Sequence, residues 1–239
     1  MNTEGPAPSV AVVGADTGAG AALAAGLEDL GASVVTLPGA VLARGVGFRA
    51  ALDDAGRGAG ALDAVVIASV GTGPTLPGAL SELDADAWHA RVEVPLQRTL
   101  VGFQGAYGAL RAGGGTLVLV VPTLALIGAA GFGPWAAVTE GQRALAKAAG
   151  RAWGPSAVTV HCVAVPAALL VREAAPTGAG VLPPGHETRL DRPGQPPPAL
   201  DAPDMRGCVA PVVQTLISPA WRSVTGATVA VDGGVWMTP

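Results

Sequence analysis

The stretch Ser9-Val10-Ala11-Val12-Val13, followed directly by Gly14-Ala-Asp-Thr-Gly-Ala-Gly20, decides the fold class. A short, continuous apolar run of this kind is typical of a parallel strand that is buried on both faces. The next residues, Ala21 to Leu30, favour a helix, and Gly31 is a natural cap for its C-terminal end. The order of strand, glycine turn and helix is the context in which a glycine motif predicts a nucleotide-binding turn.

The glycine turn has a concrete use in such a context. Glycines let the backbone approach a pyrophosphate closely, and the following helix N-terminus supplies N–H donors and a partial positive charge. A second interpretation stays open, in which the tight turn is kept for packing after nucleotide binding was lost. The candidate cofactor-binding residues are Gly14, Asp16, Thr17, Gly18, Ala19 and Gly20.

Strand-like and helix-like segments alternate along the rest of the chain. This alternation predicts an α/β fold: a single Rossmann-type domain over residues 1–239, with a doubly wound parallel sheet and helices on both faces. Residues 172–203 are dense in Pro and Gly and predict an irregular loop, at the place of a substrate lid or a docking surface. The expected strands are Ala32–Leu37, Leu62–Ala68, Thr116–Val121, Val158–Ala164 and a last one within Thr225–Gly234; the expected helices are Phe48–Arg57, Asp86–Ala112, Pro134–Trp153 and Asp204–Ile217.

Composition excludes several classes of function. The net charge of −4 and the absence of clustered Lys and Arg argue against a nucleic-acid surface. The apolar run Leu117–Phe132 is shorter than the ~20 residues of a membrane span and contains Pro122. Two cysteines and no visible secretory signal favour a soluble cytoplasmic protein without a membrane partner, and no metal site is expected.

Three segments in the right order carry a family resemblance. Gly14, Gly18 and Gly20 fit a Thr-Gly-x-x-x-Gly-x-Gly turn in which Val13 replaces the threonine. Leu62-Asp63 and the strand after them look like a Leu-Asp-x-x-x-Asn-Asn-Ala-Gly segment, and Val224-Thr-Gly through Asp-Gly-Gly234 matches a C-terminal signature. The whole chain resembles the short-chain dehydrogenase/reductase family, especially its ketoacyl reductase-like members.

The resemblance implies four catalytic positions: Asn, Ser, Tyr and Lys. In this chain, the expected register places Pro95 at the asparagine, Thr123 at the serine, Ala136 at the tyrosine and Glu140 at the lysine. The family tyrosine exchanges the proton at the carbonyl oxygen, and the loss of such a general acid typically costs about 10²–10⁴ in rate. No catalytic residue is therefore expected, although Thr123, His161 or a water could handle the proton in a non-standard site.

The resemblance also implies NAD or NADP as cofactor. Leu37-Pro38 ends the second strand, where an acid would bind the ribose of NAD or an arginine would mark NADP. The segment Val160–Pro166 stands where the family has an Asn and a Pro-Gly facing the nicotinamide. Binding at the pyrophosphate end is expected to be retained more easily than binding at the nicotinamide end, and the choice between NAD and NADP stays open.

The first functional hypothesis is a catalytically degenerate member of this family that serves as a structural subunit. In the family, the helices corresponding to Asp86–Ala112 and Pro134–Trp153 pack against a second subunit, so a homo-oligomer or a hetero-oligomer with an active homologue is expected. The alternative is an NAD(P)-dependent oxidoreductase of the ketoreductase or alcohol dehydrogenase type with non-standard catalytic residues. A third hypothesis is a non-redox enzyme with Glu140 as its base.

Overall fold

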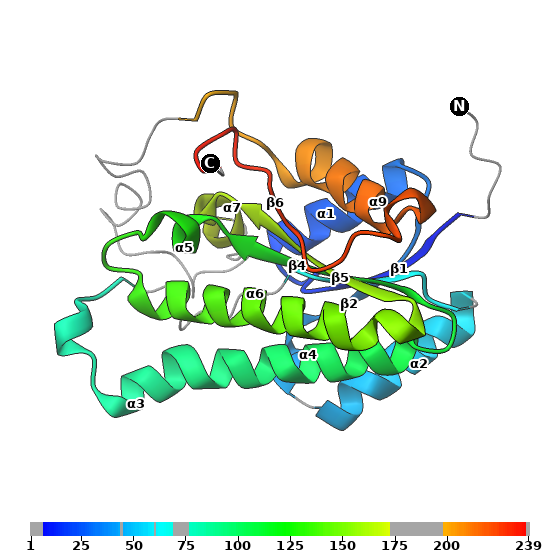
Figure 1. The fold of residues 1–239 in the computed structure, drawn as a ribbon, viewed down its shortest axis with the longest axis horizontal. Helices are drawn as coiled ribbons and strands as arrows, with labels where there is room; N and C mark the ends of the chain where they lie inside the picture. The colour runs from blue at the N-terminus through cyan, green and yellow to red at the C-terminus, as the bar shows by residue number, and fades with distance from the viewer. Residues whose placement is uncertain (1–6, 44, 60, 69–76, 173–197, 238–239) are drawn as a thin grey trace.

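A computed structural model describes residues 7–43, 45–59, 61–68, 77–172 and 198–237. Within this part of the chain, the strands form one parallel sheet with the order β2-β1-β3-β4-β5-β6 (Figure 1). The predicted Rossmann-type sheet is therefore confirmed, whereas most of the predicted loop 172–203 lies outside the described residues. The strands are β1 Ser9–Val13, β2 Ser33–Leu37, β3 Ala64–Ile67, β4 Gly115–Pro122, β5 Val158–Val165 and β6 Thr228–Ala230.

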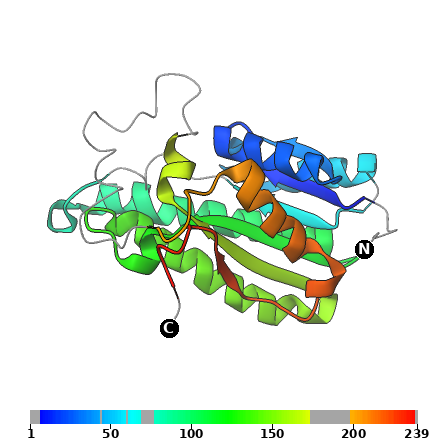
Figure 2. The same ribbon diagram turned by 90° about the horizontal axis from the view of Figure 1, so that it is seen from above.

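Helices cover both faces of the sheet, as Figures 1 and 2 show. One face packs against α2, α4 and α6, of which α4 and α6 lie side by side, and the other face packs against α1 and α9. The helices are α1 Gly18–Asp29, α2 Gly45–Ala59, α3 Ala85–Trp88, α4 Val94–Leu110, α5 Leu124–Ile127, α6 Gly133–Trp153, α7 Ala167–Arg172 and α9 Ala210–Ile217. The 3₁₀ turns are η1 Gly39–Ala43, η2 Leu80–Glu82, η4 Gly154–Ser156 and η6 Pro219–Trp221, and the π-helical turns are η3 His89–Glu93 and η5 Met205–Val209.

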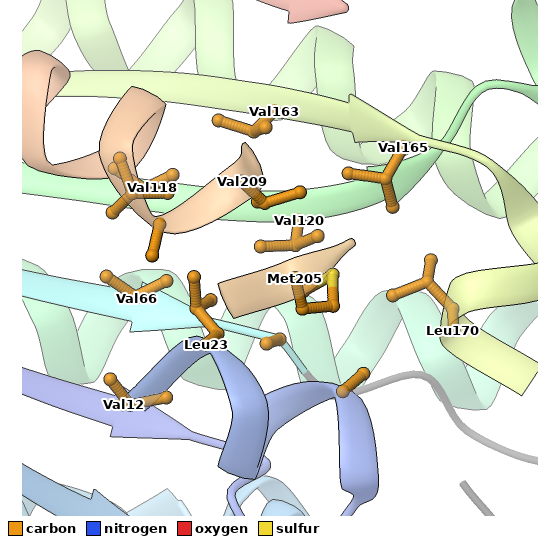
Figure 3. Packing of buried hydrophobic residues seen from close by; sticks show 14 of the residues in the cluster. Val12, Leu23, Val66, Val118, Val120, Val163, Val165, Leu170, Met205 and Val209 are labelled. Atoms are coloured by element: carbon orange, nitrogen blue, oxygen red, sulfur yellow. The ribbon is translucent and has the colours of Figure 1, made fainter. Parts of the chain in front are cut away.

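Alternate residues of each strand enter two separate apolar cores. Val10 and Val12 face the α1/α9 layer, whereas Ala11 and Val13 face the α2/α4/α6 layer. Figure 3 shows the first core, in which strand valines meet Leu23 of α1 and the side chains of η5. Because both faces are covered, the central strands are mostly apolar, which explains the apolar runs in the sequence.

The order of the strands creates a topological switch point beside β1. The chain goes from β1 to β2 on one side and then returns to β3 on the other side of β1. In doubly wound sheets, ligands bind outside the carboxyl ends of the strands at such a switch point. The glycine turn after β1 and the residues after β4 both lie at this end.

Pro95 interrupts the predicted helix Asp86–Ala112, as expected from its missing N–H. The helical path is divided into α3, the π-helical turn η3 and α4, in which Pro95 lies in the first turn. The Val94 N–H donates to the His89 carbonyl, five residues back, so the turn before the proline is wider than an α turn. The expected kink is thus confirmed as a local change of winding.

No helix in the described part of the chain is long and apolar enough to cross a membrane. The apolar run Leu117–Phe132 forms most of β4 and then α5.

The close approach of α2 and α4 gives the first testable prediction. A Cβ atom at Gly105 would lie 2.5 Å from the ring of Phe48, which is fully buried. We expect Gly105→Ala to lower the free energy of unfolding by about 1–3 kcal/mol, because the ring has to move in a packed core. The measurement is urea denaturation followed by circular dichroism.

Gly56→Ala in α2 is the matched control. A Cβ atom there would meet nothing within 4 Å, so the alanine should stabilise the helix by about 0.5–1 kcal/mol. Equal effects of the two substitutions would contradict the packing described for Gly105.

Candidate functional site

The glycine turn brings β1 and the start of α1 into very close contact. A Cβ atom at Gly20 would lie 2.1 Å from the Gly14 carbonyl oxygen, and Gly14 has a positive φ of 98°. Thr17 closes the turn, since its Oγ1 accepts the Gly20 N–H at 3.1 Å and donates to the Gly14 carbonyl at 2.7 Å. Only glycine fits this approach at position 20.

Two backbone donors at this turn are left without a protein partner in the described structure. The N–H groups of the first helical residues have no acceptor inside the helix. Thr17 satisfies the N–H of Gly20, but no hydrogen bond is made by the N–H groups of Gly18 and Ala19. Both N–H groups lie in the first turn of α1, at the end of a helix where anions bind. The turn therefore fits the pyrophosphate of a dinucleotide.

Asp16 joins the glycine turn to the tip of β2. Its Oδ1 accepts the N–H of Gly39 at 2.6 Å, and the N–H groups of Gly14 and Ala15 both donate to the carbonyl of Leu37. The candidate cofactor residues of the sequence are thus brought together on one edge of the sheet. The prediction that they bind a cofactor stays a prediction.

The side chains of α6 that point into the protein differ from those that the sequence alignment placed at the catalytic positions. Trp135 is 2% exposed and Thr139 is fully buried, and four residues of spacing put them on one face of the helix. Ala136, by contrast, is only partly buried, and Glu140 is exposed and bonded to Arg143 through both carboxylate oxygens. The inward-facing pair lies one residue before Ala136 and Glu140.

Apolar periodicity is the signal in the sequence that could have identified this face. The buried positions Trp135, Val138, Ala146 and Ala149 recur at helical spacing, and Thr139 lies among them. The Thr139 Oγ1 has no hydrogen-bond partner among the described atoms. The residues that the sequence reasoning missed are therefore Trp135 and Thr139, neither of which can replace a tyrosine or a lysine in proton transfer.

Thr123, the first residue after β4, is engaged with the backbone of β5. Thr123 is buried, and its N–H and its Oγ1 both donate to the Val165 carbonyl, at 2.8 Å and 3.3 Å. This hydroxyl thus serves the backbone at the end of β5. Keeping the family spacing of about thirteen residues from serine to tyrosine, an inward Trp135 puts Pro122 at the serine position.

The carboxyl ends of β4 and β5 are covered by apolar side chains. Phe132 and Trp135 have ring centroids 6.3 Å apart and share one buried cluster with Leu124, Val165 and Leu170. Gln142 of α6 donates to the Thr99 hydroxyl, which itself donates to the carbonyl of Pro95. The asparagine position is therefore tied into a hydrogen-bonded path between α4 and α6.

The tyrosine and the lysine of this chain lie elsewhere. The Tyr107 hydroxyl is 3.2 Å from the Ser156 Oγ, and its ring stacks on Trp153 at 4.8 Å. Ser156 precedes β5, so Tyr107 lies at the opposite end of a strand that spans about 26 Å. Lys147 is exposed on α6, about 18 Å along the helix axis from Trp135.

His161 and Cys162 are buried in the middle of β5. Burial lowers the pKa of the His161 imidazole, an effect that the backbone of Val224 partly offsets. Burial raises the pKa of the Cys162 thiol to about 12, so this thiol stays protonated and unreactive. His161 lies about 13 Å before the carboxyl end of the strand and is too far from it to exchange a proton there.

The buried His161 predicts a pH-dependent stability. Because its pKa in the folded protein lies below the value of the unfolded chain, the unfolded state binds more protons as the pH falls. The contribution of His161 to the free energy of unfolding is fully present above about pH 6.5. As the pH falls below that value, the free energy of unfolding should decrease by up to about 1.4 kcal/mol per pH unit. Urea denaturation between pH 7.5 and 5.5 measures this slope.

His161→Asn should flatten the slope in that window, whatever its effect on stability at pH 7.5. The control is His89→Asn, which removes an exposed imidazole and leaves His161 in place. A slope that survives in His161→Asn would assign the pH dependence to other groups.

Three comparisons with known proteins bear on the family of this chain. A curated relative, trans-4-hydroxycyclohexanecarboxylate dehydrogenase from Sinomonas cyclohexanicum, is 27% identical over 158 residues. The alignment covers 66% of this chain and spans only 55% of the length of that relative.

Solved structures show the same fold. A short-chain dehydrogenase/reductase from Mycobacterium ulcerans superposes with a TM-score of 0.75 at 22% identity, covering 95% of this chain and 89% of the other. A short-chain dehydrogenase/reductase variant from Serratia marcescens gives a TM-score of 0.71 at 20% identity, with 95% and 97% covered. A family model described as enoyl-(acyl carrier protein) reductase matches residues 10–236. With nearly its whole length matched, the chain belongs to the short-chain dehydrogenase/reductase family of oxidoreductases.

Proposed function

We propose that this chain is a catalytically degenerate member of its family, which keeps the dinucleotide turn and acts as a non-catalytic subunit. The observation that carries the proposal is that the inward face of α6 bears Trp135 and Thr139, two buried side chains that do not titrate, in place of a tyrosine and a lysine. The proton relay is absent in either register, because Ala136 and Glu140 supply no phenol and no ammonium group either. What the chain retains is a scaffold and an assembly surface.

Nucleotide binding is part of this proposal. The unpaired N–H groups of Gly18 and Ala19 would hold the pyrophosphate at the N-terminus of α1. The nicotinamide of a bound dinucleotide would supply hydride chemistry in an active member of the family. In this chain, Trp135 and Phe132 fill the carboxyl end of β4 and β5 with apolar surface, which would leave that ring without a proton donor.

The assembly surface is supported by apolar side chains along α3 and α4. Trp88 is 37% exposed and Leu100 is 48% exposed, both on the helical path that ends in α4. Figure 1 shows α4 alongside α6, which together form the outer layer on that face of the sheet. We propose that this helix pair packs against a second subunit, either another copy of the chain or an active homologue.

The alternative function is an NAD(P)-dependent oxidoreductase with non-standard residues. It is favoured by the family itself, since the matched relative is named a dehydrogenase. The described groups offer little for it: the Thr123 hydroxyl is engaged with Val165, and His161 is buried away from the carboxyl end of the sheet. Carbonyl turnover by the wild-type protein would favour this alternative.

Restoring the relay tests the catalytic part of the proposal. We expect Trp135→Tyr with Thr139→Lys to gain NAD(P)H-dependent reduction of small ketones, by at least about 10²-fold over the wild type. The matched control, Ala136→Tyr with Glu140→Lys, should stay inactive because these positions do not face inward. Absorbance of the reduced cofactor measures turnover, and circular dichroism checks that each variant is folded.

The two outcomes that oppose this prediction are distinct. Wild-type turnover comparable to that of the restored variant would refute catalytic degeneracy. If only the Ala136→Tyr, Glu140→Lys variant is active, Ala136 and Glu140 occupy the tyrosine and lysine positions, and Trp135 and Thr139 do not.

Charge on the α4 surface tests the assembly part of the proposal. The wild type should sediment as a dimer or larger species at micromolar concentration, and Leu100→Arg should shift it toward monomer, because a charge would be buried at the contact. Leu30→Arg is the matched control, since Leu30 is 44% exposed at the end of α1 in the opposite layer. A wild type that stays monomeric, alone and with an active homologue, would refute the assembly role.

A further inference from the structure

We infer that Asp16 selects NAD(H) over NADP(H), because the glycine turn carries its carboxylate to the tip of β2. The inference deepens the proposed function and rests on the nucleotide binding assumed there. The usual acid at the end of this strand is missing, since Leu37 and Pro38 occupy its place.

Three hydrogen bonds fix the position of Asp16 relative to β2. The Gly14 and Ala15 N–H groups donate to the Leu37 carbonyl at 2.8 Å and 3.3 Å, and the Asp16 Oδ1 accepts the Gly39 N–H at 2.6 Å. The carboxylate is therefore held at the start of η1, two residues after Leu37 ends β2. A side chain from the turn thus stands where the strand would normally present one.

The same turn holds the pyrophosphate donors. Asp16 is two residues before Gly18 and three before Ala19, whose N–H groups have no partner among the described residues. Both riboses of a dinucleotide are joined to the pyrophosphate, and in NAD-binding folds the 2′-hydroxyl of the adenosine ribose lies at the end of the second strand. A carboxylate on this turn, directed toward β2, is therefore placed for the ribose hydroxyls rather than for the distant nicotinamide.

The chemistry of the carboxylate gives the direction of selection. One oxygen, Oδ1, is occupied by Gly39, whereas no described group bonds Oδ2, and the side chain is exposed. A free carboxylate oxygen accepts a hydrogen bond from a ribose hydroxyl, as the acid at the end of β2 does in NAD-binding folds. The same oxygen would repel the 2′-phosphate of NADP, and none of the ion pairs described in the chain involves Asp16.

A purely structural role for Asp16 has to be separated from this one. The bond to Gly39 could serve only to fasten the turn. Asp16→Asn keeps an oxygen acceptor for the Gly39 N–H and removes the charge, whereas Asp16→Ala removes both. Asp86→Asn is the matched control, because it removes the same charge from an exposed residue of α3.

The experiment compares the affinities of two adenosine fragments by titration calorimetry at fixed low salt. ADP-ribose and 2′-phospho-ADP-ribose both carry the pyrophosphate and lack the nicotinamide, so the filled nicotinamide end does not affect the comparison. We expect the wild type and Asp86→Asn to bind ADP-ribose at least about tenfold more tightly than 2′-phospho-ADP-ribose. Asp16→Asn should bring the two dissociation constants to within about threefold.

Each other outcome has a definite meaning. If neither fragment binds the wild type at millimolar concentration, retained nucleotide binding fails, and the selection by Asp16 fails with it. If both fragments bind equally well to the wild type, or Asp16→Asn keeps the full preference, the role of Asp16 is refuted while the proposed function stands. If Asp16→Asn binds neither fragment and has a lower melting temperature, Asp16 only stabilises the turn and the selective role is refuted.

Discussion

The close approach of Gly20 to the carbonyl of Gly14 is the contact on which the rest of the fold depends. It lets α1 start directly above the end of β1, with 2.1 Å between the carbonyl oxygen and the place where a Cβ atom would stand. From there α1 lies over the sheet and buries Leu23 and Leu27 against alternate valines of the strands. The same geometry leaves the Gly18 and Ala19 N–H groups without a partner among the described residues, at the N-terminus of α1.

The catalytic end of the fold shows the opposite relation between packing and chemistry. The helix that presents tyrosine and lysine in the family here presents Trp135 and Thr139, both buried. Trp135 packs with Phe132, while Tyr107 is stacked on Trp153 at the far end of the sheet. A buried apolar ring stabilises the core but cannot exchange a proton, so Trp135 contributes packing at this end of the sheet.

Much of the fold could be predicted because its signals are local. The apolar runs of β1, β4 and β5, the glycine turn and the interruption at Pro95 all appear where the residues placed them. The inward face of α6 was harder to place, since Ala136 and Trp135 both suit a helix and a motif without its tyrosine has no fixed register. Burial assigns the face, because only side chains that meet the sheet are excluded from water.

The sequence by itself determined that this chain is a parallel α/β domain with a dinucleotide-type turn, because strand, turn and helix signals depend on neighbouring residues. It also determined that the segment Pro134–Trp153 contains no tyrosine, so no Tyr-x-x-x-Lys pair is present in it. Only the tertiary structure decided that Thr123 serves the backbone of β5, that Glu140 faces Arg143, and that Asp16 meets Gly39. These contacts join residues whose relation depends on how strands and helices are placed in space, and no local pattern encodes that placement.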